Sequence, residues 1–130
     1  MEACTEFGLC FGMVFQIRDD ILDVTATNGQ LQKPAGQDLA EGIYTLPTLV
    51  ALEDPDTGPD LRALLGQPLG QPERDKARDM VMGSPGIERA VTLARDYVRD
   101  AQAATAGITR PDLRAGLSRL VAELLDDLPD

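Results

Sequence analysis

The sequence predicts an all-α fold, a helical bundle, and three observations support this prediction. No stretch of the 130 residues alternates apolar and polar side chains with the period of two that marks a half-buried strand. The apolar run from Ala3 to Val24 is too long for a strand, and later apolar residues recur at intervals of three and four. Serine, threonine and proline also stand at positions typical of helix starts. We expect residues 1–130 to form a single domain.

The first predicted helix, residues 3–24, is apolar on most sides and carries one small, polar and acidic face. At 100° per residue this face spans about a third of the circumference. It consists of Gly8, Gly12, Gln16, Asp19, Asp20 and Asp23. The remaining sides carry Phe7, Phe11, Val14, Ile17, Ile21, Leu22 and Val24. Burial of such side chains contributes ~1.5–3 kcal/mol each. We therefore expect a core helix that carries three carboxylates.

Carboxylates on a core helix need a partner, because an unpaired buried carboxylate is costly. They must face a cavity, be protonated, pair with cations or bind a metal. A set of oxygen ligands in a chain without histidine suits a hard divalent ion such as Mg²⁺. The alternative is that residues 19–23 form the solvated acidic end of an amphipathic helix. Spacing alone leaves both interpretations open.

The rest of the chain is predicted to form shorter helices and then two long ones. Thr45, with Pro47 in the first turn, begins a short helix that ends near Glu53. Further helices are expected at 60–65, at 73–82, from a Ser84 cap to Gly107, and after Thr109. The inward residues of the helix after Ser84 are Ile87, Ala90, Val91, Ala94, Val98 and Ala101. Those of the last helix are Leu113, Leu117, Leu120, Val121, Leu124 and Leu125.

Composition limits the classes of function. A formal charge of −10 argues against nucleic acid and anionic membranes as partners. It also argues that a diphosphate would be captured only through a metal, since carboxylates and phosphates repel one another. The N-terminus lacks a basic region, and charges interrupt the apolar run, so we expect neither a signal peptide nor a membrane span. We therefore expect a cytoplasmic protein. Cys4 and Cys10 are too far apart on one helix for a disulfide, and we expect two reduced, buried thiols.

Three motifs in a fixed order carry a family resemblance. FQIRDDILD at residues 15–23 is followed by QKPAGQDL at 32–39 and EGIYTLP at 41–47. In this order the chain resembles the trans-isoprenyl diphosphate synthases, the polyprenyl synthetase family, whose pattern is FQxxDDxxD followed by GKxxGxDLxxGKxTLP. Two positions depart from the pattern: Gln32 stands for a glycine, and Ile43 stands for a lysine. The resemblance implies the C-terminal part of an isoprenoid-synthase fold.

The resemblance also implies site residues. Asp19, Asp20 and Asp23 would form the second aspartate-rich motif of the family and bind Mg²⁺ facing the allylic diphosphate. Gln16 would lie beside that diphosphate, and Lys33 would contact a phosphate oxygen. Asp38 and Gly36 would organise the loop.

The implied function is that of a prenyltransferase of isoprenoid biosynthesis. Such an enzyme condenses an allylic diphosphate with isopentenyl diphosphate in an Mg²⁺-dependent reaction. The first aspartate-rich motif of the family has no counterpart here, so we expect a C-terminal fragment of a polyprenyl synthetase domain, inactive alone, that dimerises with or complements a synthase chain. Two alternatives stay open: a noncatalytic regulatory or dimerisation subunit of a full-length synthase, and a helical interaction module with incidental carboxylates. An exposed apolar surface on the first helix would favour the first two hypotheses.

Overall fold

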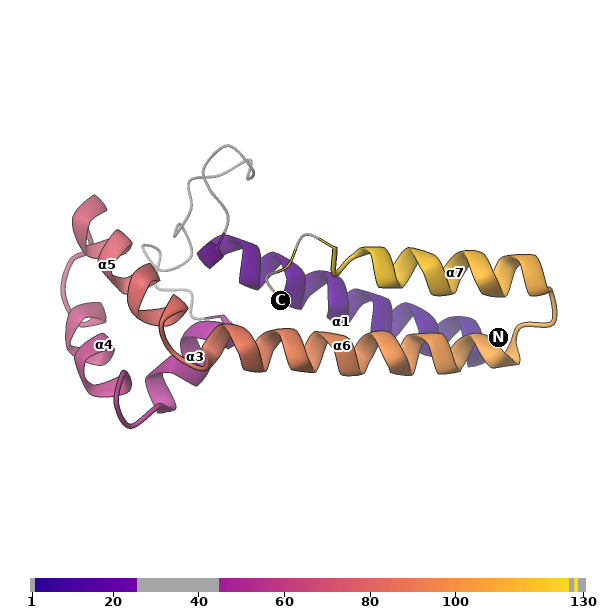
Figure 1. Cartoon of the computed structure of the whole chain (residues 1–130), viewed down its shortest axis with the longest axis horizontal. Coiled ribbons are helices and arrows are strands. Elements are labelled where there is room, and N and C mark those ends of the chain that lie inside the picture. Colours follow the sequence, from indigo (N-terminus) through magenta and orange to yellow (C-terminus); the bar gives the residue numbers. More distant parts are fainter. Residues whose placement is uncertain (1, 26–44, 127, 129–130) are drawn as a thin grey trace. The chain divides into compact units, whose positions relative to one another are not determined.

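The computed structural model describes residues 2–25, 45–126 and 128, and in them it shows helices and turns but no strand (Figure 1). The helices are α1 (Glu2–Thr25), α3 (Leu46–Glu53), α4 (Gly58–Leu65), α5 (Gln71–Met82), α6 (Gly86–Ala104) and α7 (Pro111–Glu123), with a 3₁₀ turn η1 (Thr105–Gly107). The prediction of an all-α fold is confirmed. None of the helices so described is long and apolar enough to cross a membrane.

The chain divides into two compact units. The first comprises residues 1–19 and 91–130, and the second comprises residues 20–90. Helices α1 and α6 each contribute to both units. The single domain expected over residues 1–130 stays a prediction.

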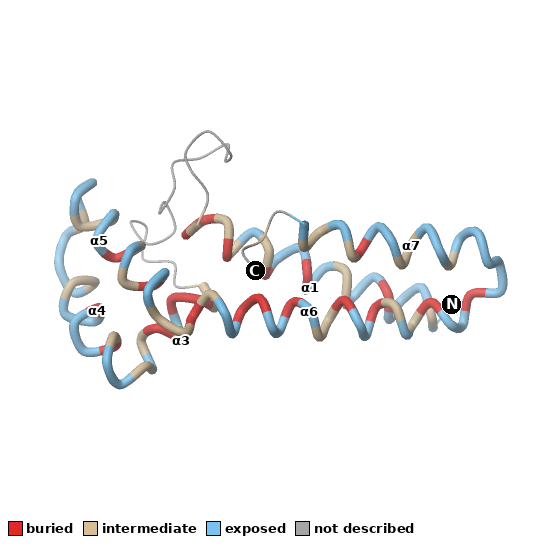
Figure 2. The backbone as a smooth tube through the Cα atoms, viewed as in Figure 1, coloured by how far each residue is buried: buried red, intermediate tan, exposed pale blue. Residues whose placement is uncertain are grey.

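The first unit is built on one apolar cluster to which α1, α6 and α7 all contribute. Its buried members are Phe7, Val14, Val98, Ala101 and Val121. The rings of Phe7 and Phe11 stack with their centroids 6.0 Å apart. Gln102 on α6 donates a hydrogen bond from Nε2 to the carbonyl oxygen of Ser118 on α7, at 3.3 Å. Buried segments recur along α6 in Figure 2, as the period of its apolar residues predicts.

The last helix differs from its prediction. Leu113 and Leu120, expected in the core, are 43% and 47% exposed, whereas Val121 is fully buried. Leu120 lies 100° around the helix from Val121, and Leu113 lies in the first turn. A helix that is covered along only one face buries fewer of its apolar side chains than the sequence pattern predicts. The cap residue is Arg110 rather than the predicted Thr109.

The second unit packs the end of α1 against short helices. The buried members of its cluster are Val24, Ala51, Leu61, Ala77 and Val81. Gly86, at the start of α6, allows close backbone approach, since a Cβ there would lie 2.3 Å from the carbonyl oxygen of Pro47. The predicted Ser84 cap is confirmed, because its Oγ accepts a hydrogen bond from the Gly86 backbone N–H at 3.1 Å. The predicted Thr45 cap has no side-chain hydrogen bond.

Candidate functional site

The predicted acidic motif lies in the last turns of α1, and its three carboxylates differ in exposure. Asp19 is exposed, Asp20 is half-buried, and Asp23 is only 1% exposed. Val24, which follows Asp23, and Ile21, two residues before it, are fully buried. The helical period alone placed the three carboxylates on one face. The structure shows that they do not share one environment. Asp19 is open to a ligand from solvent, whereas Asp23 lies in the interior.

Further towards its N-terminus, α1 carries an exposed apolar surface. Leu9 is 68% exposed, Phe15 is 49% exposed and Met13 is 42% exposed. A Cβ added at Gly8 or Gly12 would meet nothing within 4 Å. We name this surface the exposed α1 face, and it consists of Gly8, Leu9, Gly12, Met13, Phe15 and Gln16. α1 is thus a core helix on one side only, and Gln16, predicted beside a diphosphate, is exposed on the other.

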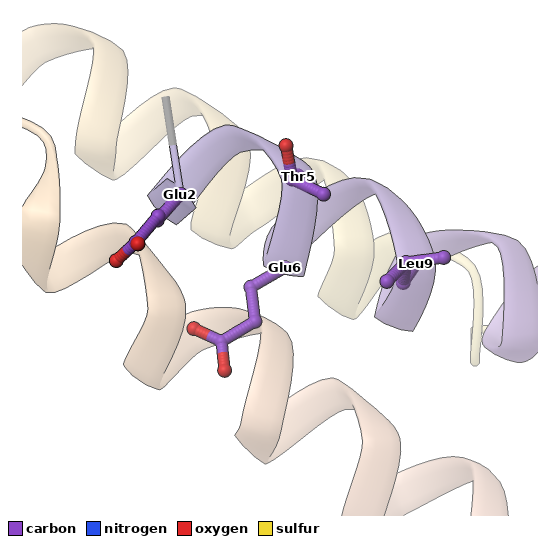
Figure 3. A pocket seen from close by; sticks show the side chains of 4 residues that line it. All are labelled: Glu2, Thr5, Glu6 and Leu9. Atoms are coloured by element: carbon purple, nitrogen blue, oxygen red, sulfur yellow. The ribbon is translucent and has the colours of Figure 1, made fainter.

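The hollows near the start of α1 are lined by acidic groups. One is lined by Glu2, Thr5, Glu6 and Leu9, all on α1 (Figure 3). Another is lined by Glu6 and Cys10 of α1 with Asp100 of α6 and neighbouring alanines. Carboxylates repel an anionic diphosphate unless a cation intervenes. These hollows are therefore poor candidates for a diphosphate site.

The two thiols differ from their prediction in exposure. Both are free, but Cys4 is exposed, so the expectation of two buried thiols is wrong for Cys4. Cys10 is half-buried. Burial raises the pKa of the Cys10 thiol, and the nearby carboxylates of Asp100 and Glu6 raise it further. The Cys10 thiol is therefore held in its protonated, less nucleophilic form.

The end of α1 is held by a residue that sequence reasoning did not assign to the site. Arg78 on α5 donates from Nε and from Nη2 to the carbonyl oxygen of Val24, at 3.0 and 2.8 Å. Thr25 Oγ1 also donates to the carbonyl oxygen of Ile21, at 3.1 Å. The carbonyl of Val24, in the last turn of α1, lacks an intrahelical donor, and Arg78 supplies one. The sequence contains no signal that pairs Arg78 with Val24, 54 residues away.

Three predicted residues cannot be placed. Lys33, Gly36 and Asp38 lie outside the described residues. Within the described ranges, no group of three or more Asp, Glu, Cys or His side chains is arranged to hold a metal ion by itself. Asp19, Asp20 and Asp23, the predicted Mg²⁺ ligands, do not form such a group, and their role stays a prediction. Mg²⁺ usually takes one or two carboxylates and completes its shell with water and substrate phosphates. The oxygen donors of Asp19 and Asp20, exposed and half-buried, fit that ion.

Comparisons with known proteins identify the family that the sequence resembles. Residues 1–81 match the family model described as polyprenyl synthetase. The chain is 39% identical over 121 residues to solanesyl diphosphate synthase 1, chloroplastic, of Arabidopsis thaliana. This match covers 92% of this chain and 29% of that protein. It is also 35% identical over 125 residues to nonaprenyl diphosphate synthase of Mycobacterium tuberculosis. This second match covers 93% of this chain and 37% of that protein.

Solved structures show the same relation. Geranylgeranyl pyrophosphate synthase of Corynebacterium glutamicum, in complex with calcium and isoprenyl diphosphate, matches with a TM-score of 0.86 and 31% identity. The match covers 98% of this chain and 40% of that one. The chain therefore spans less than half the length of these relatives, and over that length it has the helical fold of isoprenoid synthases. On the family match and the structural match together, the chain belongs to the polyprenyl synthetase family.

Proposed function

We propose that this chain forms the part of a polyprenyl diphosphate synthase active site that holds an allylic diphosphate through Mg²⁺. The observation that carries the proposal is the acidic end of α1, where Asp19 is open to solvent and Asp20 is half-buried, within the stretch that matches the polyprenyl synthetase family model. Asp19 and Asp20 are the proposed metal ligands. Asp23 is buried, and we propose that it either binds the metal from the buried side of the helix or orients the carboxylates of Asp19 and Asp20.

The remaining proposed contacts are to the diphosphate. Gln16 lies three residues before Asp19 on α1 and is exposed, so its amide can donate to a phosphate oxygen. Lys33 is proposed to contact a phosphate oxygen directly, with Asp38 and Gly36 organising its loop. When bound, Mg²⁺ neutralises the charge that develops on the leaving diphosphate as the allylic bond ionises. Ionisation of the allylic bond requires no proton from a protein side chain, so the absence of histidine from the chain is compatible with it.

We also propose that condensation with isopentenyl diphosphate requires the portion of the synthase fold outside the matched region. The support is that the chain covers 40% of the matched geranylgeranyl pyrophosphate synthase structure and carries an exposed α1 face. Large apolar side chains gathered on one face mark an interaction surface more often than a solvated one. The proposed occupant is the remaining helical portion of a synthase, in the same polypeptide or in a second chain.

The exposed α1 face also favours a second candidate function, that of a noncatalytic regulatory or dimerisation subunit. Such a subunit would use the apolar surface and would not need the carboxylates. The two candidates differ at one residue. A catalytic contribution requires Asp19, whereas a regulatory subunit with Asp19→Ala would leave its partner's activity unchanged.

The test is prenyl transfer from radiolabelled isopentenyl diphosphate to an allylic diphosphate. The chain is assayed alone and after coexpression with the part of the Mycobacterium tuberculosis synthase that lies outside the match. We expect no elongation by the chain alone and Mg²⁺-dependent elongation by the pair, lost in Asp19→Ala and retained in Asp56→Ala, a control at an exposed carboxylate between α3 and α4. Elongation by the chain alone would contradict the proposed need for a partner, and full activity of Asp19→Ala in the pair would favour the regulatory subunit.

A further inference from the structure

The carboxyl-terminal turn of α1 is joined to α5 by apolar contact and by a charged side chain. Val24 packs in one cluster with Ala77 and Val81, which are one residue before and three residues after Arg78 on α5. From the same stretch of α5, Arg78 reaches the carbonyl oxygen of Val24 with two donors, at 3.0 and 2.8 Å. Hydrogen bonds from a charged donor are about twice as strong as neutral ones. The guanidinium also places a positive charge at the negative end of the helix dipole of α1.

This contact lies at the carboxylates. Asp23 directly precedes Val24, and Asp20 lies one turn before it. We call residues 20–24 the carboxylate turn. A metal ligand has to be held within a fraction of an ångström of its productive position, and it is usually fixed by hydrogen bonds from residues that do not touch the metal. Arg78 donates to the backbone of this turn through the carbonyl oxygen of Val24.

We propose that Arg78 is the positioning residue of the carboxylate turn, so that fixing the Val24 carbonyl sets the affinity of the α1 carboxylates for Mg²⁺ with diphosphate. This inference rests on the proposed function. It assigns Arg78 no contact with metal or substrate. Its role is to keep the last turn of α1 helical and to fix it against α5.

The test compares three variants of the chain. Arg78→Met keeps an unbranched apolar stem but removes both donors and the charge. Arg78→Lys keeps the charge and a single donor group. Arg74→Met is the matched control, because Arg74 lies one turn earlier on α5 and donates to Gln71 on the same helix, at 2.6 Å. The three together separate loss of charge on α5 from loss of the contact with Val24.

The first readout is the dissociation constant of preformed magnesium pyrophosphate for the chain, measured by calorimetry with the heat of titration into buffer subtracted. We expect Arg78→Met to raise it about tenfold, Arg78→Lys to recover part of the loss, and Arg74→Met to match the wild type. Urea unfolding without Mg²⁺ is measured in parallel. If Arg78→Met lowers only the unfolding midpoint and the folded variant binds Mg²⁺ as the wild type does, Arg78 is a structural residue and the inference is wrong.

The second readout needs no ligand. Hydrogen exchange of the backbone amides of residues 20–25 should become about tenfold faster in Arg78→Met and stay unchanged in Arg74→Met, because opening of the last turn then costs less free energy. Unchanged exchange in Arg78→Met would overturn the inference whatever the binding result. Absence of Mg²⁺ binding by the wild type would instead contradict the proposed function, and the exchange result would still report whether Arg78 holds the turn.

Discussion

Replacing Gly12 by alanine acts on the exposed α1 face in two ways that can be measured separately. In the chain by itself, a Cβ at position 12 would meet nothing within 4 Å, so the substitution adds no steric conflict. Alanine is favoured over glycine inside a helix by ~0.5–1 kcal/mol, because glycine loses more backbone entropy on folding. We expect the free energy of unfolding, measured by urea titration, to rise by about that amount in Gly12→Ala.

Association with a covering helix should respond in the opposite direction. Small residues on a helix let a second backbone approach closely, and a methyl group inserted into a tight contact costs ~1–3 kcal/mol. If the remaining portion of a synthase packs over Gly12, Gly12→Ala should weaken association about five- to a hundredfold. The assay is calorimetric titration of the chain with the complementary portion of a relative, together with reconstituted prenyl transfer.

Gly116→Ala on α7 is the matched control, since a Cβ there also meets nothing within 4 Å. It should give the same gain in stability and leave association unchanged. A lower stability of Gly12→Ala would contradict the open surface that the structure shows. A higher stability with undiminished association would refute close packing of a partner over Gly12.

Two further predictions concern the second unit. Gly86→Ala should lower the free energy of unfolding by ~1–3 kcal/mol, because its Cβ would lie 2.3 Å from the Pro47 carbonyl oxygen. This loss should exceed the gain from the better helix propensity of alanine. A urea titration showing equal or greater stability would disprove that close approach. Asp54 accepts a hydrogen bond from the Thr57 backbone N–H at 2.9 Å, and this bond is the main cause that lowers the pKa of the Asp54 carboxyl. Since the folded pKa lies below the unfolded value of about 3.9, the Asp54 contribution is present above that pH and is lost as the pH falls through the folded pKa. Stability should therefore fall less in Asp54→Asn than in the wild type as the pH falls below about 4. Identical pH profiles would contradict the role of the Thr57 bond.

Much of the fold could be predicted from the sequence because it follows from local rules. α1 extends from Glu2 to Thr25, one residue beyond the predicted 3–24 at each end, since one long apolar run defines it. The inward stripe of α6 was predicted at Ala90, Ala94 and Ala101, all fully buried, because a period of three and four assigns a face. The Ser84 cap follows from the chemistry of a serine before a proline.

The rest depends on which elements meet, and a helical period does not contain that information. Asp19 and Asp23 are one turn apart, yet one is exposed and the other is buried. Leu113 and Leu120 were expected in the core and are exposed because α7 is covered along a narrower face than its leucines offer. The contact of Arg78 with Val24 joins two helices 54 residues apart, and only the folded chain brings them together. The candidate site was therefore predictable as a motif, while its support was not.

The measurement to make first is the thermal unfolding midpoint of the chain titrated with Mg²⁺ and a prenyl diphosphate analogue. A ligand that binds only the folded state at a hundred times its dissociation constant adds ~2.7 kcal/mol of stability. We predict a rise in midpoint that needs both Mg²⁺ and the diphosphate, that is lost in Asp19→Ala, and that is kept in Asp56→Ala. A cooperatively unfolding chain whose midpoint does not move, or moves equally in Asp19→Ala, would contradict a diphosphate site at the acidic end of α1.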